Sequence, residues 1–159
     1  MSMTDNPRAI VDEDALSVRR TIRIAAPVEK VWSAITDPAH ISQWFGQTVL
    51  DGAGVGATGT MTFDGYGAIP IRVEEVDELR SITYRWGNDD AAETLPDAVT
   101  ADNSTVFTFT LDEVADGTQL IVVETGFEHT SDPVSNARDH GTGWTDELDK
   151  LVALLEGAA

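Results

Sequence analysis

The sequence predicts a single α+β domain in which helices cover one face of an antiparallel sheet. Three observations predict this fold class. They are several alternating apolar–polar segments separated by turn residues, two short amphipathic segments near the N-terminus, and one long apolar stripe near the C-terminus. With 159 residues, 42% of them hydrophobic, the chain is long enough for one domain with its own core and short for two.

A polar segment precedes the first predicted strand. Residues 1–14 are polar and aperiodic, so we expect a flexible tail followed by a single domain at 15–159. Residues 16–24 then alternate between apolar and polar side chains. This alternation is typical of a strand that buries one face and exposes the other.

Two short helices are predicted directly after this strand. The first begins behind Pro27, where apolar residues recur through 28–35 at the spacing of one helical face. The second begins at the Asp-Pro pair of DPAHISQWFG, which supplies an N-cap acceptor and a first-turn proline. Its Ile41, Trp44 and Phe45 share one face. A helix this short is not stable alone, so these side chains must cover another part of the molecule.

Alternating apolar and polar residues predict five more strands in the middle of the chain. Asp64-Gly65-Tyr66-Gly67 is typical of a hairpin turn between the first two of them. Residues 87–103 are acidic and aperiodic, and we expect a long loop over one end of the sheet. The five predicted strands are 56–65, 66–77, 80–86, 104–114 and 117–127.

One long helix is predicted at the C-terminus. It begins at a second Asp-Pro pair and runs over 133–156, a length of roughly 36 Å at 1.5 Å per residue, which is enough to cross a sheet. Gly141 lies on its apolar stripe, where it leaves either space for a ligand or room for close helix–sheet packing. The stripe consists of Ala137, Gly141, Trp144, Leu148, Leu151, Val152 and Leu155.

Composition excludes several classes of function. The chain has 28 acidic and 10 basic residues, a formal net charge of −18, which repels nucleic acids and anionic membranes. No segment is long and apolar enough for membrane insertion. There is no cysteine, and His40, His129 and His140 do not follow a metal-ligand spacing. We therefore expect a cytoplasmic protein without a metal or a cofactor.

Three segments resemble one known family. They are IAAPVEKVWSAITDPAHISQWFG, GTQLIVVETGF and GWTDELDKLVALLEG. They are similar to the activator-of-heat-shock-protein-90-ATPase-like branch of the START-like (SRPBCC) superfamily, and the resemblance extends from about Leu16 to Leu155. It implies a helix-grip fold, in which a curved antiparallel sheet of about six or seven strands wraps around the long C-terminal helix. It also implies a cavity between sheet and helix.

The resemblance implies three kinds of function. The first is binding of a small hydrophobic or amphipathic molecule in the cavity. The second is a cyclase- or dehydratase-like enzyme that uses the same cavity, and the third is a co-chaperone-like protein-interaction module. The sequence leaves open whether catalysis occurs, whether the chain forms a homodimer and whether a chaperone is its partner. We expect the short helix with Trp44 and Phe45 to plug the open end of the sheet and form part of the cavity rim.

Glu124 is the charged residue of greatest interest. It shares strand parity with Leu120 and Val122, but Ile121 and Val123 make the opposite face equally apolar, so both orientations stay open. A buried carboxylate needs a partner or takes up a proton. Glu124 is therefore either a structural carboxylate or a group that binds ligand or transfers protons.

The candidate site residues are mostly aromatic, as in pockets for small ligands. Glu124, His140 and Tyr84 are the acid–base candidates. The full set of predicted ligand-binding residues is Trp44, Phe45, Phe63, Tyr84, Trp86, Phe107, Phe109, Glu124, His140, Gly141 and Trp144.

Overall fold

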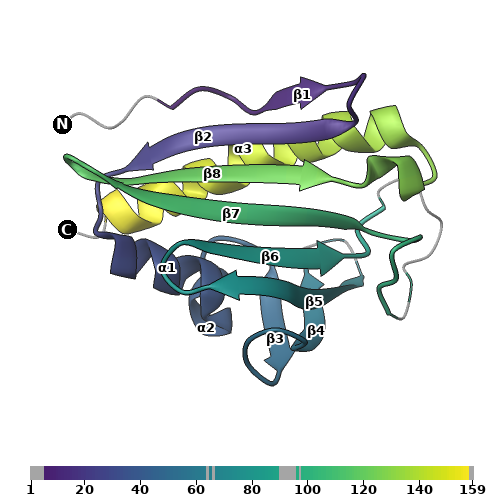
Figure 1. The fold of residues 1–159 in the computed structure, drawn as a ribbon, viewed down its shortest axis with the longest axis horizontal. Coiled ribbons are helices and arrows are strands. Elements are labelled where there is room, and N and C mark those ends of the chain that lie inside the picture. Colours follow the sequence, from purple (N-terminus) through teal and green to yellow (C-terminus); the bar gives the residue numbers. More distant parts are fainter. Residues whose placement is uncertain (1–5, 64, 66, 90–95, 97, 158–159) are drawn as a thin grey trace.

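The protein folds into a curved antiparallel sheet with a long helix packed on its concave face (Figure 1). The computed structural model describes residues 6–63, 65, 67–89, 96 and 98–157. Asp64 and Tyr66 of the predicted hairpin turn at 64–67, residues 90–95 and 97 of the predicted loop at 87–103, and the first five residues of the predicted tail lie outside the described residues. The α+β helix-grip fold predicted from the sequence is confirmed.

The described residues form eight strands and three α-helices, with a short 3-10 helix before the last of them. The helices are α1 (Val28–Thr36), α2 (Pro38–Ile41), η1 (Phe127–His129) and α3 (Pro133–Gly157). The strands are β1 (Ile10–Asp12), β2 (Ser17–Ile24), β3 (Gln47–Asp51), β4 (Thr58–Thr62), β5 (Ala68–Asp77), β6 (Ser81–Trp86), β7 (Thr105–Val114) and β8 (Gly117–Thr125).

The predicted number of six or seven strands is wrong, because the described residues contain two short strands that the sequence pattern does not reveal. β1 lies inside the segment predicted as a tail and pairs with β2 through Val11 and Val18. β3 pairs with β4. A three-residue strand is too short to show an alternation, and in β3 the apolar Val49 points outward while the polar Thr48 is buried.

The sheet order, β1-β2-β8-β7-β6-β5-β4-β3, places the first long strand beside the last. All neighbouring strands are antiparallel. In the chain, α1 and α2 separate β2 from β3, which lies at the far edge of the sheet. The neighbour of β2 on the inner side is β8. Figure 1 shows α3 running along β2 and β8, with α1 and α2 together at one end of the sheet. No helix in the described part of the chain is long and apolar enough to span a bilayer.

The segment around α2 closes this end of the core. Asp37 caps α2 by accepting a hydrogen bond from the Ala39 amide, as the sequence predicts. Trp44 follows the helix and is only 2% exposed. Its indole Nε1 donates to the Ala34 carbonyl at 2.8 Å, and its ring stacks on Phe45 with centroids 4.9 Å apart. Trp44 is therefore a core residue that joins α1 to the turn after α2.

We expect Trp44→Ala to lower the free energy of unfolding by about 3–5 kcal/mol, because it removes a buried ring and leaves a cavity. Urea unfolding followed by circular dichroism would measure this loss. Val49→Ala is the control, since Val49 is 66% exposed and its truncation should change stability by at most about 0.5 kcal/mol. Equal effects of the two changes would contradict the core position of Trp44.

Candidate functional site

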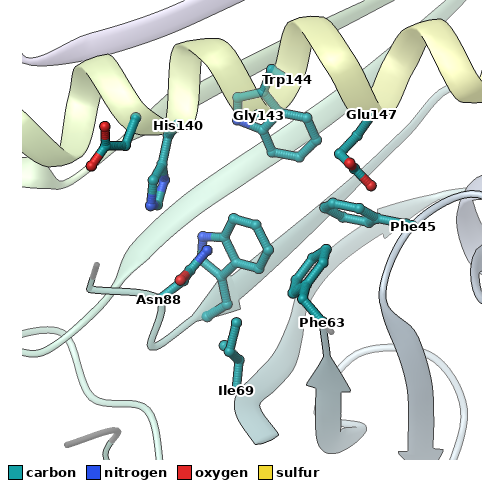
Figure 2. Close-up of a pocket in the computed structure, with 10 residues that line it drawn as sticks. Phe45, Phe63, Ile69, Asn88, His140, Gly143, Trp144 and Glu147 are labelled. Carbon is teal, nitrogen blue, oxygen red and sulfur yellow. The ribbon is translucent and has the colours of Figure 1, made fainter. Parts of the chain in front are cut away.

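A cavity of about 280 Å³ lies between α3 and the β4–β6 side of the sheet. Figure 2 shows α3 along one wall and side chains from the sheet and its loops on the other. Helix α3 contributes Asp139, His140, Gly143, Trp144 and Glu147. The opposite wall consists of Phe45, Phe63, Ile69, Trp86 and Asn88.

Four aromatic rings line the cavity: Phe45, Phe63, Trp86 and Trp144. Phe45 is central, with ring centroids 5.2 Å from Phe63, 5.7 Å from Trp86 and 5.4 Å from Trp144. Trp86 and Trp144 stack at 5.9 Å. Each ring comes from a different segment of the chain, so the cavity exists only in the folded protein.

Glu124 lies behind this wall and is completely buried. Its carboxylate accepts hydrogen bonds from Trp144 Nε1 at 2.8 Å on Oε1, and from Trp86 Nε1 at 2.8 Å and Thr105 Oγ1 at 2.5 Å on Oε2. His140 Nδ1 lies 2.9 Å from both oxygens. These four donors occupy about as many positions as a carboxylate can offer. Of the two orientations that the sequence allows for Glu124, the inward one is observed.

The surroundings of Glu124 favour its ionised form. Burial by itself would raise the pKa of Glu124. The positive charge of a protonated His140 and the hydrogen bonds around the carboxylate nevertheless hold that pKa below its ordinary value of 4.5. Two indole N–H groups can only donate, so they require an acceptor at this position. Glu124 therefore acts as a fixed acceptor that orients the cavity wall.

His140 connects Glu124 to the cavity. Because the ionised carboxylate can only accept, Nδ1 of His140 carries a hydrogen and donates it. The imidazole also packs between Phe127 and Trp86, with centroid distances of 5.1 and 5.7 Å. The hydrogen bond to Glu124 and this packing together fix the orientation of a ring that lines the cavity.

The structure divides the predicted site residues into three groups. Phe45, Phe63, Trp86, His140 and Trp144 line the cavity, and Glu124 supports three of them. The remaining four aromatic residues lie in the filled part of the core, namely Trp44, Tyr84, Phe107 and Phe109.

Tyr84 does not line the cavity, although it is one of the predicted acid–base candidates. Its hydroxyl donates to the Ile35 carbonyl at 2.7 Å, and burial raises the pKa of Tyr84. The hydroxyl is therefore occupied in holding α1 against β6.

Two glycines of α3 face different surroundings. A Cβ on Gly141 would lie 2.5 Å from Val11 Cγ2, so Gly141 permits the close approach of β1 to the helix. A Cβ on Gly143 would meet nothing within 4 Å in the described structure, and Gly143 lines the cavity. Of the two alternatives that the sequence leaves open for Gly141, close packing is observed, and the open space lies at Gly143.

Five lining residues are absent from the predicted set: Ile69, Asn88, Asp139, Gly143 and Glu147. Three of them, Asp139, Gly143 and Glu147, lie four residues apart on α3. They are therefore on the same side of the helix as His140 and Trp144. Helical periodicity from His140 and Trp144 was the available signal for these three. No group of three or more potential metal ligands is assembled within the described residues.

We expect Gly143→Ala to raise the free energy of unfolding by about 0.5–1 kcal/mol, because alanine is the better helix former and its methyl group enters open space. Thermal unfolding would measure the change. Gly141→Ala is the matched variant, since its methyl group would collide with Val11. An equal gain from both changes would contradict the close packing at Gly141.

We expect Glu124→Gln to lower the free energy of unfolding by about 3–5 kcal/mol at pH 7, as for other broken buried pairs. Because the folded-state pKa of Glu124 is lowered, its contribution is complete above the unfolded-state pKa and is lost as the pH falls through the folded-state pKa. The difference from the unchanged protein should therefore shrink below pH 4.5.

Urea unfolding at pH 7, 4 and 3 would measure this difference. Glu128→Gln is the control with the same chemical change, because the Glu128 side chain is 58% exposed. A difference that does not vary with pH would show that Glu124 is not ionised in the folded state.

Comparison with known proteins places the chain in one family. The family model "Activator of Hsp90 ATPase homolog 1-like protein" matches residues 25–156. Protein MLL2253 from Mesorhizobium loti is 27% identical, with a TM-score of 0.74 over 90% of this chain and 98% of its own. DynU16, a protein of the dynemicin biosynthetic locus, is 26% identical, with a TM-score of 0.68 over 88% of this chain and 47% of its own.

A third structure shows the fold alone. The Aha1 dimer from Colwellia psychrerythraea is 22% identical, with a TM-score of 0.66 over 88% of this chain and 96% of its own. No curated protein sequence gives a significant match. The family model covers all elements from α1 to nearly the end of α3. The chain belongs to the activator of Hsp90 ATPase homolog 1-like family of the START-like superfamily.

Proposed function

We propose that this protein binds a small hydrophobic or amphipathic molecule in the cavity between α3 and the sheet. The observation that carries the proposal is the aromatic cavity itself, whose two tryptophans are fixed by Glu124. Ligand pockets are typically formed in advance, mostly apolar and equipped with a few placed polar groups. This cavity has all three properties.

The size of the cavity bounds the ligand. A volume of about 280 Å³ lies just below the range of about 300–1,000 Å³ for small-molecule pockets. One or two rings with a short substituent fill such a space, whereas a long acyl chain would extend into solvent. The similarity to DynU16, a protein of a biosynthetic locus, supports a small-molecule role.

Acid–base catalysis in the same cavity is the second candidate function. It is favoured by the contact between His140 and Glu124, because a carboxylate that fixes the Nδ1 hydrogen of a histidine is a recurring arrangement in proton transfer. Glu124 itself is enclosed by donors and acts here as a positioning residue. A compound found to bind is the compound to test for turnover.

We expect native mass spectrometry of the purified protein, followed by a thermal-shift screen, to identify ligands among polyketide-like aromatics, flavonoids and lipids. A ligand at a hundred times its dissociation constant adds about 2.7 kcal/mol to the free energy of unfolding. At this chain length, that should raise the melting temperature by several degrees. Aromatic compounds of one or two rings should give the largest shifts.

Gly143→Leu is the decisive variant for this screen, because its side chain would fill the cavity without removing a native contact. It should abolish the shifts while the protein stays folded. Thr142→Leu adds the same side chain to the exposed side of α3 and should leave the shifts unchanged. Shifts that survive in Gly143→Leu, or no shift across the panel, would contradict binding in this cavity. The alternative of a protein-interaction module would then be tested by pull-downs with chaperones.

A further inference from the structure

We infer that the cavity selects a ligand with a positively charged amine attached to an apolar or aromatic body, and that Glu147 binds the amine. This inference rests on the proposed function and specifies its ligand. It is carried by one carboxylate oxygen, by the distribution of charge around the cavity and by the chemistry of the aromatic wall.

Glu147 lines the cavity and has one carboxylate oxygen without a hydrogen-bond partner among the described residues. Its side chain is 18% exposed, and Oε2 accepts a hydrogen bond from Lys150 Nζ at 2.9 Å. Oε1 is buried and has no hydrogen-bond partner within the described part of the chain. Figure 2 shows this carboxylate beside Phe45, on the cavity side of α3. A buried acceptor without a donor is costly, so a ligand that donates a hydrogen bond here is favoured.

The charges around the cavity disfavour an anionic ligand. Asp139 and Glu147 both line it, the charge of the lining His140 is paired with Glu124, and no lysine or arginine lines it. All ten basic residues of the chain lie within the described residues, so the segments outside them cannot supply a lysine or arginine. The net charge of −18 acts in the same direction. A carboxylate or phosphate would therefore enter a field of its own sign.

The aromatic wall complements a cation. The rings of Phe45, Trp86 and Trp144 lie within 6 Å of one another, and their faces attract an ammonium group. Aromatic rings beside a carboxylate are the usual chemistry for recognising amines and quaternary ammonium groups.

Lys150 does not prevent this recognition. Its side chain is 59% exposed, and its pair with Glu147 is a single surface contact of the i,i+3 type. Such pairs contribute little to stability. The pair engages Oε2 and leaves Oε1 without a partner in the described structure, so a ligand amine at Oε1 need not displace Lys150.

Three probes of the same shape test the sign of the ligand charge. Isothermal titration calorimetry would compare 3-(2-naphthyl)propylamine, the neutral 3-(2-naphthyl)propanamide and the anionic 3-(2-naphthyl)propionate. We expect the amine to bind at least tenfold more tightly than the propionate, with the amide between them. Equal affinities, or tighter binding of the propionate, would overturn the inference.

Two variants separate Glu147 from the overall negative charge. Glu147→Gln and the neighbouring Asp146→Asn change the net charge equally, but Asp146 is exposed and does not line the cavity. Glu147→Gln should weaken amine binding at least fivefold and change amide binding less than twofold. Asp146→Asn should change amine binding less than twofold. Equal losses in both variants would overturn the role of Glu147 and indicate non-specific attraction.

The same titrations distinguish this inference from the proposed function. If the amide or propionate binds and Gly143→Leu abolishes that binding, the cavity is functional even where the preference for an amine fails. If none of the three probes binds, the inference is overturned, and the broader thermal-shift panel decides separately whether the cavity binds anything.

Discussion

The structure depends on one buried carboxylate. Glu124 on β8 accepts hydrogen bonds from Trp86 on β6, Thr105 on β7 and both His140 and Trp144 on α3. Removing a carboxylate from water costs several kcal/mol unless its oxygens are fully satisfied. Here the four donors satisfy it only when three strands and the long helix are correctly placed. The same contacts orient two walls of the cavity, so the group that specifies the fold also shapes the site.

A buried cation on the adjacent strand holds the same turn of α3. Arg20 is 2% exposed and donates to the carbonyl oxygens of Thr145 at 2.8 Å and Trp144 at 3.3 Å, and to Asp149 Oδ1 at 2.7 Å. Trp144 is thus bound through its indole by Glu124 and through its backbone by Arg20. Apolar packing alone tolerates sliding of a helix on a sheet, whereas two charged anchors of opposite sign specify one register.

Sequence patterns were sufficient for the architecture because long elements carry strong periodicity, as the stripe of α3 and the alternation of β7 demonstrate. They were insufficient where tertiary contacts decide. The inward orientation of Glu124 depends on donors from β6, β7 and α3, which no local pattern encodes. Arg20 interrupts an otherwise apolar row of β2, and it is explained by its partners on α3, two backbone carbonyls and the Asp149 carboxylate. The space at Gly143, rather than Gly141, depends on where β1 lies.

The position of the cavity follows from these anchors and from the sizes of the side chains. Near α1 and α2, Trp44, Tyr84 and Phe109 fill the space between helix and sheet, and each is at most 3% exposed. Farther along α3, Gly143 contributes no side chain, and Glu124 holds both the neighbouring indole of Trp144 and the indole of Trp86 on the opposite wall, so neither ring moves into the gap. A core of flexible aliphatic residues would collapse into such a gap. The fixed indoles keep it open, so the same carboxylate that requires the correct fold also preserves the space available to a ligand.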